Sequence, residues 1–282
     1  MENRQNPLSK YFRQPAIYIK LPSEGKFWPE GSVNLPVNGE LPIYPLTTRD
    51  EITLRTPDAL MNGSGVVEVI QSCVPNIVDA WQTPSVDIDA ILIAIRIASY
   101  GERMDLESGC PHCRARNTHS VGLQNALSSI RCPDYDKLYK FQEHIEIKFC
   151  PTTFFGKNRQ NALNFEQQKM LQALESATLP DEERANIINT SMKKLVDLNN
   201  EILTESTEYV EIDSKIKVDD KDFIMEFYTE APTKLNKEIQ ETLSEISTYA
   251  GIKSQPVNCS ECGTEYQLPL TFDYAAFFGQ GS

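Results

Sequence analysis

The sequence predicts an α+β fold: a helical core combined with two β-hairpins that carry cysteine pairs, and an inserted helical hairpin. Residues 85–100 read as one apolar helix, two Cys-x-x-Cys pairs lie between short strand-like segments, and residues 160–204 are polar with a helical period. We expect four regions along the chain: an N-terminal arm and irregular β region (1–46), a helical core with the first cysteine pair (47–150), an inserted helical hairpin (151–206), and a β-hairpin, helix, second cysteine pair and aromatic tail (207–282).

The N-terminal region is rich in proline, glycine and aromatic residues and shows no helical period. The stretches 18–21 and 33–44 have the composition of short strands, and prolines interrupt the region around them. An arm followed by irregular β structure is therefore expected.

Helix starts mark the beginning of the core. Thr48 and Glu51 have the Thr-x-x-Glu spacing of a capping box, and Thr56-Pro57 has the pattern of an N-cap followed by proline in the first turn. Each pattern predicts that a helix begins there.

Two apolar helices are expected to follow in the core. Gly63-Ser-Gly65 leads into an apolar segment that stops before Pro75, and the helix after Pro84 stops at Gly101. Because this second helix is apolar on nearly all sides, we place it at the centre of the core.

The second half of the chain has three clear periodic patterns. Residues 145–149 alternate as a half-buried strand, 160–204 predict two antiparallel helices, and 235–250 predict a helix that ends at Gly251. The alternation in 216–218 and 223–227 predicts a β-hairpin that turns at the acidic residues between them.

Charge and hydropathy exclude several classes of function. The chain of 282 residues has a net charge of −13, which argues against nucleic-acid binding. Residues 1–26 carry five basic and two acidic side chains, or +3, so the other residues carry −16. We expect no membrane span, because the longest apolar run is shorter than the ~20 residues required. The polar start lacks the apolar stretch of a secretory signal, which favours a reducing cytoplasm.

Four of the seven cysteines form the pairs Cys110-Pro-His-Cys113 and Cys259-Ser-Glu-Cys262. Two residues between ligands let one turn direct both sulfurs at one ion, and Zn²⁺ accepts a tetrahedron of four thiolates. Since each pair has strand-like flanks, the sequence predicts a zinc ribbon with one structural zinc ion bound by both pairs. Residues 114–258, 145 in all, separate them, but the loop-closure penalty rises by only about 0.6 kcal/mol per doubling of length.

Other interpretations of the cysteines stay open. The first pair resembles the active-site motif of oxidising thioredoxin-fold enzymes, which requires a helix directly after the motif. Two unrelated pairs on separate surface turns are a further alternative. Cys73, Cys132 and Cys150 lie outside the pattern and are expected to pack as small hydrophobic side chains.

No catalytic constellation is found, and we expect no enzyme. The sequence has only three histidines and contains no nucleophile elbow, phosphate loop or metalloprotease helix motif. A zinc ion bound by four cysteines has no open position for water, so it could not be catalytic. Both termini instead carry large aromatic residues of the kind that anchor interfaces. The candidates for partner binding are Tyr11, Phe12, Phe27, Trp28, Phe272, Tyr274, Phe277 and Phe278. The simpler alternative is that both segments pack on their own domain.

Four stretches of the first 110 residues together resemble the T4-type phage baseplate hub assembly proteins. They are Leu21-Pro-Ser-Glu-Gly-Lys-Phe-Trp-Pro29, Thr56-Pro-Asp-Ala-Leu-Met-Asn-Gly63, Val69-Ile-Gln-Ser-Cys73 and Asp89-Ala-Ile-Leu-Ile-Ala-Ile-Arg-Ile-Ala98. The cysteine hairpins are moderately similar, and residues 155–205 show no similarity.

The resemblance implies a non-enzymatic late phage protein that helps to assemble the baseplate hub of a contractile tail in the cytoplasm of the infected host. Its implied partners are other hub proteins, with the tape-measure protein as a further candidate. It leaves open whether the protein acts as a chaperone or stays in the virion. A zinc-ribbon adaptor that binds a host or phage enzyme is the competing hypothesis, and a thiol oxidoreductase is a third.

Overall fold

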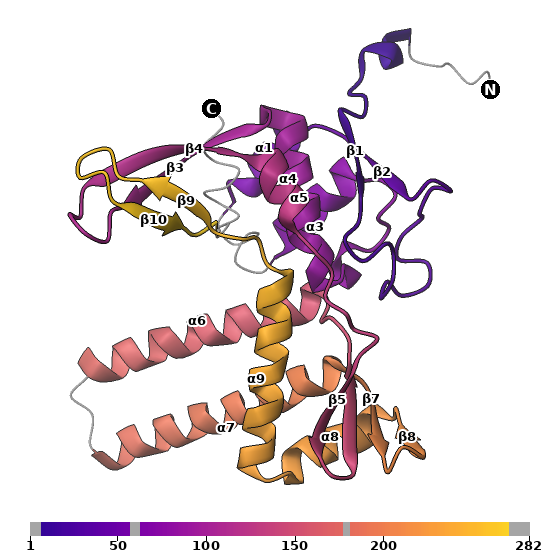
Figure 1. Ribbon diagram of the computed structural model, residues 1–282, viewed down its shortest axis with the longest axis vertical. Coiled ribbons are helices and arrows are strands. Elements are labelled where there is room, and N and C mark those ends of the chain that lie inside the picture. The colour runs from indigo at the N-terminus through magenta and orange to yellow at the C-terminus, as the bar shows by residue number, and fades with distance from the viewer. Residues whose placement is uncertain (1–6, 57–62, 177–180, 271–282) are drawn as a thin grey trace. The chain divides into compact units, whose positions relative to one another are not determined.

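A computed structural model describes residues 7–56, 63–176 and 181–270 (Figure 1). By their contacts, the described residues divide into two units. The first contains the chain up to Ala80, Asp87–Ile130 and the residues from Ile252 on; the second contains Trp81–Val86 and Arg131–Gly251. Helices and strands occur in both, so the fold is α+β, as the sequence predicts.

The first unit is built from short paired strands around helices. Its elements are η1 (Pro7–Tyr11), β1 (Ile17–Lys20), β2 (Glu40–Ile43), α1 (Thr48–Leu54), α3 (Ser64–Cys73), η2 (Ala80–Gln82, at the boundary), α4 (Ser85–Tyr100, from Asp87 on), β3 (Arg103–Gly109), β4 (Arg116–Gly122), α5 (Leu123–Ser129), β9 (Gln255–Asn258) and β10 (Glu265–Leu268). Three two-stranded antiparallel sheets result: β1–β2, β3–β4 and β9–β10.

Helix α4 occupies the core of this unit, as its sequence predicts. Its side chains from Ala90 to Ile95 are all buried, each with at most 1% exposure. Burying an aliphatic side chain of this size contributes about 1.5–3 kcal/mol, so α4 is a main source of the unit's stability. Helix α3 also packs here, with Val66, Val69 and Ile70 fully buried.

The capping box of α1 lies one residue earlier than the sequence pattern predicts. Thr47, not Thr48, is the N-cap, and its partner is Asp50 instead of Glu51. Asp50 Oδ2 accepts hydrogen bonds from the backbone and hydroxyl of Thr47, at 2.8 Å each. Both pairs have the required spacing, so the spacing alone could not distinguish them. The second predicted start, at Thr56-Pro57, extends beyond the described residues.

The second unit combines one four-stranded antiparallel sheet with long helices. Its elements are β5 (Leu138–Gln142), β6 (Ile145–Phe149), α6 (Phe154–Ser176), α7 (Asp181–Glu205), β7 (Thr207–Ile212), β8 (Ile216–Val218), α8 (Lys221–Glu230) and α9 (Thr233–Ala250). The strand order is β5-β6-β7-β8. Helices α6 and α7 form the predicted helical hairpin, whose two arms run side by side in Figure 1.

The predicted hairpin between 216–218 and 223–227 is wrong. Strand β8 pairs with β7 instead, and residues 221–230 form helix α8. Asp220 starts this helix by accepting hydrogen bonds from the backbone of Asp222 and Phe223. The buried side chains of α8 are Ile224 and Tyr228, four residues apart on one helical face. The alternation that suggested a strand was therefore incidental.

No helix in the described ranges is long and apolar enough to cross a membrane.

Candidate metal centre

The first cysteine pair lies in the tight turn that joins β3 to β4. The backbone N–H of Cys110 donates to the carbonyl of Ala115 at 2.9 Å, and the N–H of Arg114 donates to the carbonyl of Cys110 at 2.9 Å. Closing this turn places Arg114 in the left-handed region, with φ of 63°. Few residues other than glycine adopt this conformation readily, so the turn stores backbone strain.

The second cysteine pair repeats this turn between β9 and β10. The N–H of Cys259 donates to the carbonyl of Thr264 at 3.0 Å, and the N–H of Gly263 donates to the carbonyl of Cys259 at 3.0 Å. Gly263, with φ of 71°, stands at the position that Arg114 has in the first turn. The two turns therefore share one backbone geometry, which directs both sulfurs of each pair to the same side.

The four sulfurs converge on one point. Sγ of Cys110 lies 3.7 Å from Sγ of Cys262, and Sγ of Cys113 lies 3.6 Å from Sγ of Cys259. All four are within 4.8 Å of one another, and all four cysteines are free thiols. A tetrahedron of sulfurs about 2.3 Å from a zinc ion has edges of about 3.8 Å. The cluster thus has the dimensions of a four-thiolate metal site.

Asn117, at 4% exposure, ties the two turns together. Its Oδ1 accepts hydrogen bonds from the backbone N–H and the hydroxyl of Ser260, at 2.8 Å each. Its Nδ2 donates to the carbonyl of Ala115 at 2.9 Å and lies 3.5 Å from Sγ of Cys259. One side chain from β4 therefore holds the second turn in place beside the first.

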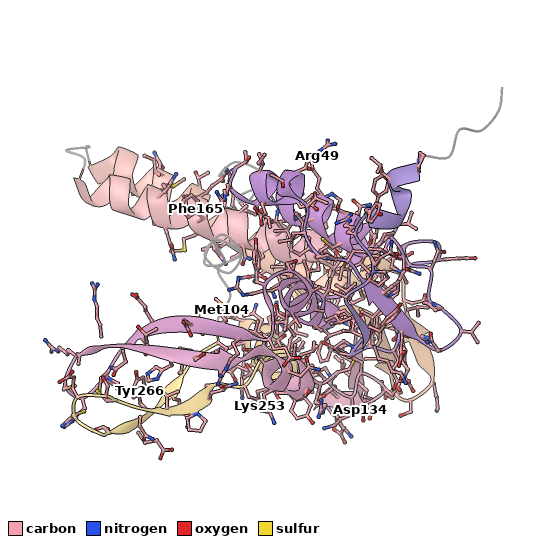
Figure 2. The ribbon with its side chains drawn as sticks, turned by 90° about the horizontal axis from the view of Figure 1, so that it is seen from above. Arg49, Met104, Asp134, Phe165, Lys253 and Tyr266 are labelled. Atoms are coloured by element: carbon pink, nitrogen blue, oxygen red, sulfur yellow. The ribbon has the colours of Figure 1, made fainter. Side chains whose placement is uncertain are left out.

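Tyr266 makes the reciprocal contact from β10 to the other hairpin. Its hydroxyl lies 2.6 Å from Oγ of Ser108 and 2.8 Å from Nε2 of His119, within hydrogen-bond range of both. Figure 2 labels Tyr266 where its hairpin lies beside β3 and β4. Both Asn117 and Tyr266 stand four residues after the second cysteine of their pair. The sequence analysis missed both, although this shared offset was visible.

The cluster cannot readily hold four negative charges by itself. The backbone N–H of Cys262, with that of Glu261 and the Asn117 amide, lowers the pKa of Cys259 to about 6. The N–H of Ala115 lowers the pKa of Cys113, but the neighbouring thiols outweigh it and raise that pKa to about 12. Ionising all four thiols therefore requires a nearby cation, and a metal ion bound among them would supply that charge.

The other residues that sequence analysis considered as metal ligands or reactive thiols, His112 and the three remaining cysteines, do not belong to this cluster. His112 is exposed on its turn, and the cluster that could hold a metal, within the described residues, consists of the four cysteines alone. Cys73 is buried, whereas Cys132 and Cys150 are half-buried. Burial raises the pKa of the Cys73 thiol to about 12, which makes it unreactive.

The predicted partner-binding residues lie apart from this cluster in the sequence, and the structure describes half of them. Tyr11 and Phe12 are 74% and 56% exposed, whereas Phe27 and Trp28 are half-buried. Trp28 donates its indole N–H to Asp87 at 2.8 Å. Phe272, Tyr274, Phe277 and Phe278 lie outside the described residues.

Fold and site together define an α+β protein with a compact four-cysteine cluster that could bind a metal ion. The model of the family described as T4 bacteriophage base plate protein matches residues 17–279, so the chain belongs to that family. Comparison with curated proteins and with solved structures gave no match. Baseplate families are usually structural rather than enzymatic, and membership implies partners among other phage proteins, in the tail or during its assembly.

The left-handed position of the second turn gives a direct test of this geometry. Gly263→Ala should lower the free energy of unfolding by about 1 kcal/mol, because alanine is strained at this φ. A Cβ at Gly263 would meet nothing within 4 Å, so steric contact adds nothing to the effect. Gly109→Ala is the matched control, since Gly109 also faces open space but is not in the left-handed region. Urea unfolding measures both; equal effects would contradict the explanation.

Proposed function

We propose that the protein helps to assemble the central hub of the phage baseplate through protein–protein contacts, without catalysing a reaction. One structural zinc ion bound by Cys110, Cys113, Cys259 and Cys262 would fix its two cysteine hairpins. The observation that carries this proposal is the convergence of four sulfurs from distant turns in a chain of the baseplate family. Other hub proteins are the proposed partners, with the tape-measure protein as a further candidate.

Zinc is the metal that the four ligands favour. A set of four thiolates in a tetrahedron is typical of structural zinc sites and leaves no open position for water or substrate. The ion would supply cross-linking and charge neutralisation. Four thiolates leave a formal charge of −2 on the site, and the exposed Arg114 and Arg116 follow the first pair closely enough to offset part of it.

The oxidoreductase alternative has less support from the fold. A thioredoxin-type motif requires a helix directly after its cysteines, which lowers the pKa of the first thiol. Here the first pair is followed by strand β4. The zinc-ribbon adaptor remains the competing hypothesis, because its metal site would have the same geometry.

Of the proposed contact surfaces, the N-terminal arm with Tyr11 and Phe12 is the one for which the structure describes an anchor. Arg13 fastens it to the first unit: its guanidinium donates to the carbonyl of Ser72 at 2.6 Å, to the hydroxyl of Ser72 at 2.9 Å and to the carbonyl of Pro45 at 2.9 Å. The exposed rings of Tyr11 and Phe12 directly precede this anchor. Held in this way, they can insert into a partner with less loss of conformational entropy than a free tail.

The remaining candidate contacts are Phe27, Trp28 and the C-terminal aromatic residues Phe272, Tyr274, Phe277 and Phe278. We propose the C-terminal group as a second anchor because its apolar residues are close together in the sequence.

The proposal is tested by comparing purified particles with assembly intermediates. The protein should be recovered with hub proteins from intermediates, and its presence or absence in finished particles decides between virion component and chaperone. The double variant Tyr11→Ser, Phe12→Ser should reduce this recovery at least about tenfold, as expected for loss of interface aromatic residues. Phe223→Ser is the control, because Phe223 is a 62% exposed aromatic residue on α8 of the second unit. Recovery with polymerase or another enzyme in place of hub proteins would favour the adaptor.

A further inference from the structure

The four cysteines of the cluster are not equally accessible. Cys110 and Cys259, the first cysteine of each pair, are 2% and 3% exposed. Cys113 and Cys262, the second cysteine of each pair, are both exposed. Each turn therefore presents one cysteine to solvent and shelters the other, so a reagent from solution reaches the cluster through Cys113 or Cys262.

Each exposed cysteine has a sheltered cysteine of the opposite hairpin close to it. Sγ of Cys113 lies 3.6 Å from Sγ of Cys259, and Sγ of Cys262 lies 3.7 Å from Sγ of Cys110. A disulfide bond has a length of about 2.05 Å, so each of these pairs would have to approach by only about 1.6 Å. An accessible thiol beside a second thiol that can react with it is the arrangement found in redox-sensitive cysteines.

Contacts between the hairpins hold these two cross-hairpin pairs in place. Asn117 of β4 accepts hydrogen bonds from the backbone N–H and the hydroxyl of Ser260 in the second turn. Tyr266 of β10 is within hydrogen-bond range of Ser108 and His119 in the first hairpin. These four contacts involve no sulfur atom, so a chemical change at the thiols leaves them intact.

We propose that the cluster is a site of oxidation by peroxides, which form two disulfide bonds between the hairpins, Cys113–Cys259 and Cys110–Cys262. The covalent bonds then take over from the metal ion as the link between the hairpins. This pairing rests on the positions of the sulfurs, whatever metal they bind. The accompanying release of zinc rests on the zinc site of the proposed function.

Each disulfide forms in two steps. The thiolate of Cys113 attacks one oxygen of hydrogen peroxide, the O–O bond breaks, hydroxide leaves, and the sulfur becomes a sulfenic acid. The thiolate of Cys259 then attacks this sulfur, forms the S–S bond and displaces a second hydroxide. The two sulfurs lose two electrons to one peroxide molecule, and solvent protons convert both hydroxides to water. Cys262 and Cys110 react in the same way, so four thiolates consume two peroxide molecules and no longer hold a metal ion.

The surroundings decide which form the cluster has. Glutathione and thioredoxin keep thiols reduced in the cytoplasm, whereas disulfides persist outside the cell. On the proposed function, the cluster is therefore reduced while the baseplate is assembled and becomes oxidised where the protein meets peroxide outside the cell. This timing rests on the proposed function, and the pairing of the sulfurs does not.

The test treats the full-length protein with hydrogen peroxide, blocks the remaining thiols with iodoacetamide and maps the disulfides by mass spectrometry of proteolytic peptides. Cys113 should be linked to Cys259, and Cys110 to Cys262. Cys73, at 0% exposure, is the internal control and should stay reduced. Disulfides within each Cys-x-x-Cys pair, a link between Cys113 and Cys262, or sulfinic acids without any link would overturn the proposal.

A measurement of metal release separates this proposal from the zinc site itself. A chromogenic zinc chelator should report one zinc ion released for every two peroxide molecules consumed. A protein that contains no zinc before oxidation would contradict the zinc site of the proposed function, and its disulfide map would still decide the pairing. Zinc release without disulfides would contradict the pairing alone.

Asn117→Ala tests whether the hairpin contacts direct the pairing. Without this side chain the second turn loses two hydrogen bonds to the first hairpin, so the share of cross-hairpin disulfides should fall at least about threefold in favour of links within each pair. Thr118→Ala is the matched control, because Thr118 is exposed on the same strand, and it should leave the share unchanged. An unchanged share in Asn117→Ala would contradict this explanation of the pairing.

Hydrogen exchange shows whether the disulfides replace the metal ion as the link. In the oxidised wild type, exchange in β9 and β10 should stay slow after a chelator has removed the metal. Fast exchange in these strands would contradict the proposal.

Discussion

Replacing Cys110 with serine is expected to abolish binding of the proposed zinc ion and to release the two cysteine hairpins from each other. Structural zinc sites in small peptides have apparent binding free energies of about 10–16 kcal/mol, most of which depends on a complete ligand set. Native mass spectrometry should therefore find one zinc ion per wild-type chain and none in the variant.

The contacts between the hairpins are too few to replace the metal. Besides the contact of Asn117 Nδ2 with Sγ of Cys259, four hydrogen bonds cross between the hairpins, made by Ser108, His119 and Ser260, each worth about 1 kcal/mol net. Together these bonds are worth much less than the roughly 10–16 kcal/mol of apparent binding free energy of a structural zinc site in small peptides, so they cannot take its place. We expect hydrogen exchange in β9 and β10 to become fast in Cys110→Ser, while α4 stays protected in the core.

Cys132→Ser is the matched control, because Cys132 is a half-buried thiol outside the cluster. It should keep the zinc ion and the slow exchange of β9 and β10. A wild-type protein that folds without metal and keeps both hairpins protected would refute the zinc site, whatever its family.

The cysteine site shows what sequence patterns can and cannot predict. Each cysteine pair is local in sequence, and a spacing of two residues between the cysteines suits a single tight turn that directs both sulfurs to one side. Asn117 and Tyr266 were missed because each acts on the opposite hairpin. Both residues act through tertiary contacts between the two hairpins, and the sequence of one hairpin alone does not show which residues of the other it will contact.

The fold shows the same limit in helix α8. Large apolar residues stand at every second position, 223, 225 and 227, which favours a strand, although Ile224 between them is apolar too. Asp220 in front of them favours a helix start. Tertiary contact decides in favour of the helix. Tyr228 is buried, and its hydroxyl lies 2.6 Å from Oγ1 of the buried Thr207, a contact that the helix makes. By contrast, α4 was predictable because its apolar side chains allow few arrangements other than burial on all sides.

A second large effect is expected at Asp87, the buried carboxylate at the start of α4. It accepts hydrogen bonds from the N–H of Ser23 at 2.9 Å, from the Ser23 hydroxyl at 2.5 Å and from the Trp28 indole at 2.8 Å. These bonds hold a strained loop, in which Glu24 and Phe27 both have positive φ. Asp87→Ala would leave the donors without their acceptor, at about 1–3 kcal/mol each, and should lower the free energy of unfolding by roughly 3–5 kcal/mol.

Asp89→Ala is the control for this loss, since Asp89 lies on the same helix and is only half-buried. It should change the free energy of unfolding by less than about 1 kcal/mol. If both variants lost a similar amount of unfolding free energy, the loss would come from removing an acidic residue near the helix N-terminus and not from the contact of Asp87 with the loop.

The same carboxylate should also make stability depend on pH. Burial raises the pKa of Asp87, and the hydrogen bonds from Ser23 and Trp28 oppose that rise only in part. Because the folded pKa exceeds the unfolded value of about 3.9, the folded protein binds the proton more tightly, and stability falls as the pH rises between the two values. Asp87→Asn removes this titration, so the stability of the wild type relative to this variant should decrease from about pH 4 upward and then level off. Urea unfolding at a series of pH values measures the difference; a difference that grows with pH would mean that the hydrogen bonds outweigh burial and that the folded pKa is lowered.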